Sequence, residues 1–138
     1  MEEMKTVLRV DREARERLLV RLGDLLAGRP EVSFAFVFGS CLDQDEFRDI
    51  DVGIWTAPSP SSRVDVELAA EASAALGVPV AVRRVNDAPV SFLFHVLRGR
   101  ALVVRDEDML ATLMERTVRQ YHDHAPLVHR AARDAFAR

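Results

Sequence analysis

Two short apolar segments joined by an acidic loop constrain the fold of this chain more than any other feature of its sequence. The first segment, Phe34 to Phe38, ends abruptly at Gly39-Ser40, and the second, Ile50 to Trp55, follows directly after Asp49. Apolar runs of this length that are bounded by turn residues are typical of strands buried in a sheet. The sequence therefore predicts two core strands, with polar residues where each strand meets the loop.

Asp49 and Asp51 are two positions apart at the head of the second strand. Side chains alternate along a strand, so both carboxylates are expected on the same side of the chain. Like charges held this close repel each other, and a bound cation relieves the repulsion. Mg²⁺ suits such a pair because it takes few protein ligands and leaves room for phosphate oxygens.

Gly39 and Ser40 form the turn that ends the first strand. Glycine lets the backbone approach a ligand closely, and such a turn can direct N–H groups at a phosphate. Taken singly, a Gly-Ser turn is common, and Asp49 with Asp51 is also compatible with a solvated strand edge. The combination of strand, Gly-Ser turn, short loop and paired aspartates favours a functional site.

The remaining pattern predicts a single α+β domain over residues 1–138. Asp11 is a plausible N-cap, and Gly28 with Pro30 ends the first helix. The order of elements predicts a small mixed sheet of three to four strands with helices packed on it. The predicted strands are 32–38, 49–55, 78–85 and 101–105, and the predicted helices are 11–28, 63–76, 90–97 and a C-terminal region of 106–138 that is interrupted near Ala125-Pro126.

Charge and composition narrow the class of protein. The 138-residue chain has a net charge of −3, which gives no general attraction to nucleic acid or to anionic membranes. Its one cysteine, Cys41, excludes an internal disulfide. We find no apolar leader after the Met-Glu-Glu start and no stretch that could cross a bilayer, so we expect a cytoplasmic protein.

Three motifs carry a resemblance to a known family: Gly39-Ser40, Asp49-Ile50-Asp51-Val52 and Asn86-Asp87-Ala88-Pro89. Over nearly its whole length the chain resembles the minimal nucleotidyltransferase (MNT) family, a branch of the DNA polymerase β-like nucleotidyltransferase superfamily. Residues 97–103 and Tyr121-His122-Asp123 point to the MNT branch. The resemblance implies a nucleotidyltransferase fold with C-terminal helices, and a role as the antitoxin partner of a HEPN-domain toxin.

The resemblance also implies roles for single residues. Gly39 and Ser40 would hold the phosphates of ATP or another NTP, and Asp49 and Asp51 would be the catalytic residues that bind Mg²⁺ or Mn²⁺. The metal would neutralise the triphosphate and align attack on the α-phosphorus. The expected reaction moves an NMP, most simply AMP, onto a hydroxyl of the partner protein, which in the family is a toxin tyrosine.

Some features depart from the family pattern. Family members with full activity carry a third acidic residue on the next strand, where this chain has Ala81. The loop after Ser40 is shorter than usual and holds three acidic residues, Asp43, Asp45 and Glu46. We expect Arg48, Arg83 and Arg84 to offset part of their charge. These departures motivate an alternative, a catalytically weak or inactive binding module that neutralises its partner by covering it. Nucleotidylation of an antibiotic fits less well, since the chain lacks a second domain to enclose a sugar.

Several smaller signals favour packing over function. We expect Cys41 and Trp55 to be packing residues, with a reactive thiol and a base-stacking ring as the alternatives. The histidines of the last helical region, His122, His124 and His129, are expected on a solvated surface. An apolar stripe from Leu127 to Phe136 repeats at helical spacing. It predicts packing on the domain body, or alternatively a face for a partner helix or a second copy of the chain.

Overall fold

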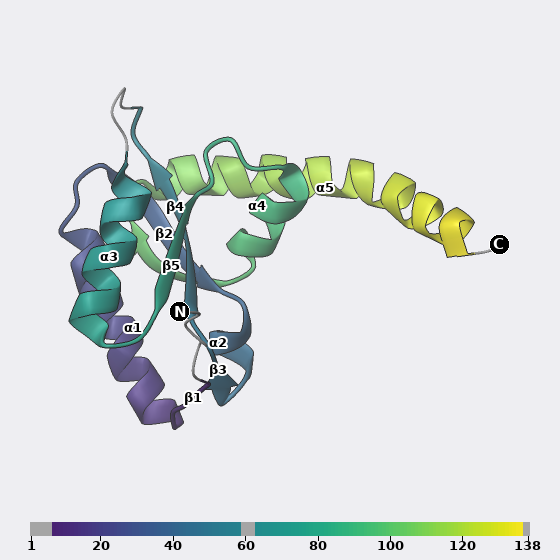
Figure 1. The fold of residues 1–138 in the computed structure, drawn as a ribbon. Coiled ribbons are helices and arrows are strands. Elements are labelled where there is room, and N and C mark those ends of the chain that lie inside the picture. The colour runs from purple at the N-terminus through teal and green to yellow at the C-terminus, as the bar shows by residue number, and fades with distance from the viewer. Residues whose placement is uncertain (1–6, 59–62, 137–138) are drawn as a thin grey trace.

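A four-stranded mixed sheet forms the centre of the molecule (Figure 1). The computed structural model describes residues 7–58 and 63–136, with side chains described as far as Asp123 in the last helix. The strand order is β5-β4-β2-β6, where β2 pairs antiparallel with β4 and β6, and β4 pairs parallel with β5. The strands are β2 (Val32–Phe38), β4 (Ile50–Thr56), β5 (Val80–Arg84) and β6 (Arg100–Val104).

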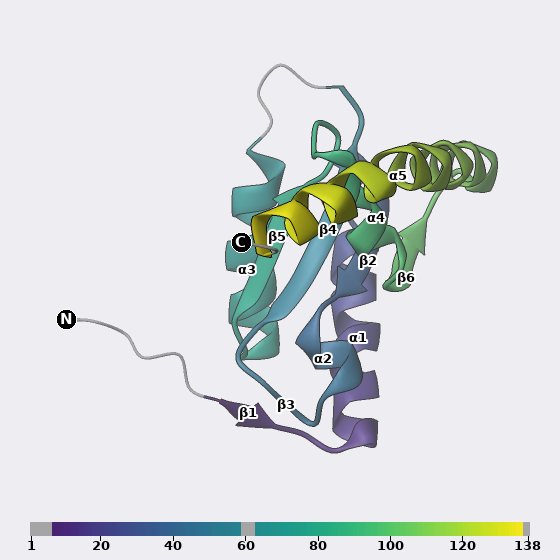
Figure 2. The ribbon, with the colours of Figure 1, turned by 90° about the vertical axis from the view of Figure 1, so that its right-hand side faces the viewer.

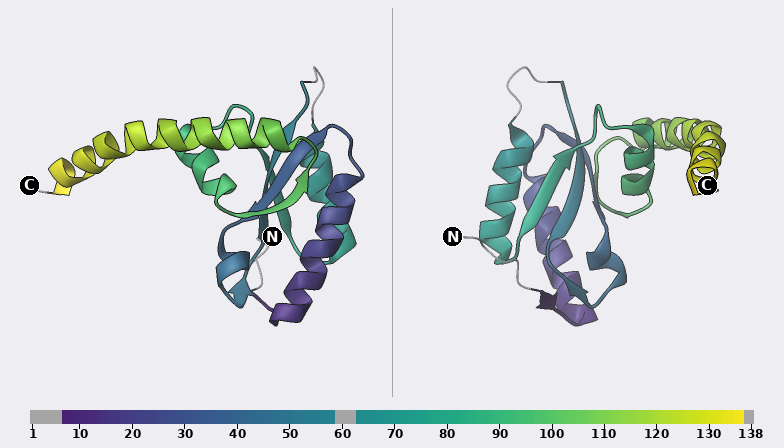
Figure 3. Two further views of the ribbon diagram at one scale, coloured as in Figure 1. Left: turned by 180° about the vertical axis from the view of Figure 1, so that it is seen from behind. Right: turned by 45° about the vertical axis from the view of Figure 1, so that its right-hand side comes forward.

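Helices cover both faces of this sheet, which explains why β2 is apolar at nearly every position. Helices α1 (Arg12–Ala27) and α3 (Val64–Leu76) lie on one face of the sheet (Figure 3). They build a core that includes Leu22, Leu68 and Val52. On the other face, α4 (Val90–Leu97) and α5 (Glu107–Phe136) pack against the phenylalanines of β2. The predicted α+β fold with a mixed sheet is therefore confirmed.

The helix boundaries follow from local chemistry. Asp11 caps α1 by accepting a hydrogen bond from the N–H of Ala14 at 2.7 Å, as the sequence predicts. Asp106 caps α5 in the same way through the N–H of Met109 at 3.0 Å. Gly77 ends α3 in the left-handed conformation, with φ of 72°. None of the helices in residues 7–58 and 63–136 is both long enough and apolar enough to cross a membrane.

Three short elements escape prediction: β1 (Leu8–Arg9), α2 (Ser40–Asp43) and β3 (Glu46–Phe47). β1 and β3 form a separate two-stranded ribbon, in which Leu8 pairs with Phe47. Figure 2 shows this ribbon and α2 at one end of the molecule and α5 at the other.

The predicted interruption near Ala125-Pro126 is wrong, because α5 continues through both residues to Phe136. Proline removes one helical hydrogen bond and crowds the preceding turn, which bends a helix and need not end it. Helix α5 curves along its length (Figure 1).

Candidate functional site

Gly39 forms a sharp corner between β2 and α2. Its backbone has φ of 86° and ψ of −160°, a region that is essentially restricted to glycine. A Cβ atom at this position would lie 3.0 Å from Oδ2 of Asp51. The Asp51 carboxylate therefore lies directly against the Gly39 corner, and Ser40 follows as the first residue of α2.

The two aspartates lie at the start of β4. Asp49 immediately precedes the strand and Asp51 is its second residue; both side chains are half-buried. Asp51 pairs with Phe38 of β2 on one side and with Ala81 of β5 on the other. The structure thus brings three predicted site residues, Gly39, Ser40 and Asp51, to one end of the sheet, with Asp49 next to them along the chain.

Cys41 is buried next to this corner, and the charges of both carboxylates influence the pKa of its thiol. Burial, above all, raises the pKa of its thiol to about 11. The negative charges of Asp51 and Asp49 act in the same direction, whereas a hydrogen bond with the Asp51 backbone and the charge of Arg15 oppose them. Cys41 is therefore a neutral packing residue at physiological pH, and the alternative of a reactive thiol is wrong.

The donor set at this corner fits a magnesium ion that keeps most of its coordination for phosphate and water. Mg²⁺ is commonly bound by one or two carboxylates together with substrate phosphates. Asp49 and Asp51 supply two carboxylates next to a corner without a side chain. Among the described residues, no group of three or more His, Cys, Asp or Glu side chains is placed to hold a metal. Two carboxylates are fewer ligands than Mg²⁺ takes, so an ion held here would need further oxygens from phosphate or water.

Ala81 is the strand neighbour of Asp51 in the parallel β4–β5 register. Directly paired residues of adjacent strands point to the same face of a sheet. The position where a third carboxylate is expected therefore lies beside Asp51, and it carries only a methyl group.

An aromatic rim borders the same face. The ring of Phe38 contacts Phe92 and His95 of α4 edge to face, with ring centroids 5.7 Å and 5.4 Å apart. The guanidinium of Arg83 lies over the Phe92 ring, 4.7 Å from its centroid. Sequence reasoning missed this rim, because only the docking of α4 on the sheet shows which aromatic side chains reach the site.

The acidic loop is less of an obstacle than the sequence predicts. Asp43, Asp45 and Glu46 are all exposed, and Glu46 forms an ion pair with Arg9 of β1. That contact raises the pKa of Arg9. One of the three carboxylates is therefore engaged by the N-terminal ribbon.

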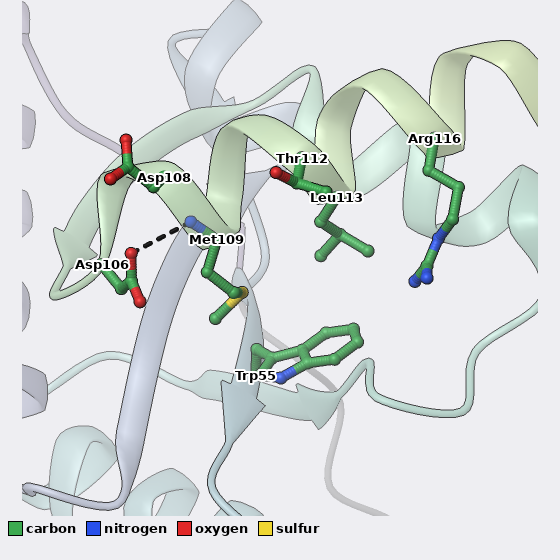
Figure 4. A pocket seen from close by; sticks show the side chains of 7 residues that line it. All are labelled: Trp55, Asp106, Asp108, Met109, Thr112, Leu113 and Arg116. Atoms are coloured by element: carbon green, nitrogen blue, oxygen red, sulfur yellow. Dashed lines mark hydrogen bonds between the residues drawn. The ribbon is translucent and has the colours of Figure 1, made fainter.

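Trp55 lies at the opposite end of β4 from Asp51, in a groove of about 470 Å³ beside the start of α5 (Figure 4). Its ring stacks on Phe34 with 5.7 Å between centroids. Trp55 is therefore a packing residue at this groove and does not face the aspartates, which supports packing over base stacking. Figure 4 also shows Asp106, the α5 cap, on the rim of the groove.

The histidine region is described only in part. His122 is exposed, and its ring contacts Tyr121, which stacks on Phe94 of α4 at 3.9 Å. The side chains of His124 and His129, and those of the apolar stripe from Leu127 to Phe136, lie outside the described part of the chain. The predictions for these residues stay predictions.

Comparisons with known proteins agree with this geometry. The family model described as "Polymerase beta, Nucleotidyltransferase" matches residues 21–108. A solved structure of a tri-AMPylated Shewanella oneidensis HEPN toxin in complex with MNT antitoxin is similar at a TM-score of 0.68 and 19% identity, covering 90% of this chain and 99% of that chain. A toxin–antitoxin structure with AMP-PNP is similar at a TM-score of 0.66 and 21% identity, covering 89% and 98%. A search of curated proteins finds no match.

Proposed function

The chain belongs to the polymerase β nucleotidyltransferase family, and on that premise we propose that it transfers an NMP from an NTP to a hydroxyl of a partner protein. AMP from ATP is the proposed nucleotide, and a HEPN-type toxin is the proposed partner, for which the chain acts as antitoxin. The observation that carries the proposal is the contact between the Gly39 corner and the Asp51 carboxylate. We also propose that the protein is cytoplasmic, because its proposed substrate ATP is found there.

The structure of this corner supports a division of roles. In this proposal Asp49 and Asp51 hold Mg²⁺ or Mn²⁺, and Gly39 and Ser40 hold the phosphates at the corner that lies against the Asp51 carboxylate. When bound, such an ion neutralises triphosphate charge and polarises the phosphoryl group under attack. The acceptor hydroxyl would lose its proton to water as its oxygen forms a bond to the α-phosphorus. The bond between the α-phosphorus and the α–β bridging oxygen would break, which leaves pyrophosphate and a nucleotidylated protein.

The solved structures support the choice of partner and nucleotide. One similar structure is a complex of a tri-AMPylated toxin with its antitoxin, and another holds AMP-PNP. Five of the similar structures, with TM-scores of 0.66 to 0.70, cover 87% to 90% of this chain and 98% to 99% of their own chains, so the likeness in fold that supports the proposal is not confined to one part of the chain.

Transfer is tested with radiolabelled ATP, Mg²⁺ and a co-purified toxin. We expect label on the toxin with the wild-type protein, and its loss with Asp49→Asn and with Asp51→Asn, since an amide cannot replace the carboxylate charge at the metal. Thermal melting controls for folding of the variants. Label that persists at the wild-type rate in both variants would contradict the assignment.

A second candidate function is a binding module that neutralises its partner by covering it. The register of Ala81 with Asp51 favours it, because the third carboxylate of active relatives is missing at that position. In this case the Asp49→Asn and Asp51→Asn variants still neutralise the toxin, whereas changes on the apolar stripe, such as Val128→Asp or Phe136→Asp, do not. Neutralisation that depends on both aspartates would exclude it.

A further inference from the structure

Arg83 lies on the face of the sheet that carries Asp51. It follows Ala81 by two positions in β5, and it pairs with Gly53 in the register that pairs Ala81 with Asp51. Side chains two apart on a strand share a face. With strands about 4.8 Å apart and about 3.3 Å per residue, the Cα atoms of Asp51 and Arg83 are roughly 8 Å apart. A long arginine side chain covers much of that distance.

The guanidinium of Arg83 is held in place by an aromatic ring. Arg83 is exposed, and its Cζ atom lies 4.7 Å from the centre of the Phe92 ring. Phe92 is itself held by Phe38, which pairs with Asp51 across β2 and β4. Within the side chains that the structure describes, Arg83 has no carboxylate partner and no hydrogen bond.

Other arginines of the chain are engaged differently. Arg29 binds three glutamates, Arg100 forms a two-point ion pair with Glu16, and Arg105 donates to backbone carbonyls. A ring under the guanidinium restricts its motion but leaves its in-plane N–H donors available. Arg83 is thus preorganised to receive an anion.

We propose that Arg83 binds phosphate oxygens of the nucleotide at the Asp49–Asp51 site. The methyl group of Ala81, between Arg83 and the aspartates, provides no carboxylate to neutralise the guanidinium. Arginine matches phosphate geometry with two parallel hydrogen bonds. The inference rests on the proposed function, because it assumes that a nucleotide occupies this corner.

The test compares nucleotides that carry three, two or one phosphate groups. Binding of ATP, ADP and AMP in the presence of Mg²⁺ is measured by calorimetry for the wild type and for Arg83→Ala, Arg83→Lys and Arg98→Ala. Arg98 is the matched control, because it also lies over a phenylalanine ring, Phe94, at 5.6 Å, but on the side of α4 that faces Tyr121.

We expect Arg83→Ala to weaken ATP binding roughly 10- to 100-fold, as for the loss of a charged hydrogen bond, and AMP binding much less. Arg83→Lys retains part of the affinity, and Arg98→Ala binds as the wild type does. Unchanged ATP affinity in Arg83→Ala, or an equal loss for ATP and AMP, would overturn the inference while leaving the proposed function intact. A wild-type protein that binds none of these nucleotides would overturn both.

Discussion

Replacing Gly39 by alanine tests how the corner positions the metal carboxylate. Two effects are expected from the geometry. The backbone at φ 86° and ψ −160° is strained by roughly 1–3 kcal/mol for a residue with a Cβ atom. The new methyl group would also lie 3.0 Å from Oδ2 of Asp51, so the carboxylate must move by a few tenths of an ångström or rotate away.

Gly77→Ala is the matched control. Gly77 also has a positive φ, of 72°, but a Cβ atom there meets nothing within 4 Å. Both substitutions reduce the entropy of the unfolded chain equally, so this effect cancels in the comparison. Left-handed strain at Gly77 is about 1–2 kcal/mol, which is similar to that at Gly39. The two variants therefore separate backbone strain from displacement of Asp51.

The assays are urea denaturation and calorimetric titration with Mg²⁺ and ATP. Both variants are expected to lose stability in the range of about 1–3 kcal/mol. Only Gly39→Ala is expected to lose affinity for the metal–nucleotide pair, by roughly 10- to 100-fold, as when a ligand-orienting contact is removed. Wild-type affinity in Gly39→Ala, or an equal loss of affinity in Gly77→Ala, would refute the argument that this corner sets the position of Asp51.

Three further outcomes are expected. Folding raises the pKa of the Cys41 thiol from 9.0 to about 11, so the folded state keeps the thiol proton to a higher pH than the unfolded state does. The contribution of the thiol to the free energy of unfolding is fully present below pH 9, and up to about 2–3 kcal/mol of it is lost between pH 9 and 11. Cys41→Ala should remove this part of the slope in urea denaturation, and an unchanged slope would show that the thiol is not responsible. Gly99→Ala should destabilise by about 3 kcal/mol or more, because its Cβ would lie 2.1 Å from the carbonyl oxygen of Val37; a thermal melt like that of the wild type would contradict this. Ala81→Asp should increase label transfer in the radiolabelled-ATP assay; unchanged transfer would mean that the third acid is dispensable here.

Strongly patterned elements are predicted from the sequence almost to the residue. The strand 32–38 and the helix 90–97 have the expected bounds, because each is a largely apolar run between turn residues. The ribbon of β1 and β3 is missed, since it depends on contacts such as Arg9 with Glu46, which are 37 positions apart. Two-residue strands carry no periodicity that could reveal such a pairing.

The candidate site divides in the same way. The pairing of aspartates with a Gly-Ser corner is visible in the sequence because all four residues lie within one strand–loop–strand unit. The contribution of Arg83 is not, because it depends on how α4 places Phe92 over the sheet. Asn86 shows another limit: its side chain bonds to both backbone groups of Thr56, so part of the Asn86-Asp87-Ala88-Pro89 motif fixes the end of β4.

Position 81 is a single base change away from an acidic residue, because every alanine codon differs from an aspartate or glutamate codon at one base. Ala81 is half-buried on β5, which is an edge strand of the sheet. A gene of this kind can therefore gain or lose a carboxylate beside Asp51 within one generation, while the rest of the domain stays unchanged.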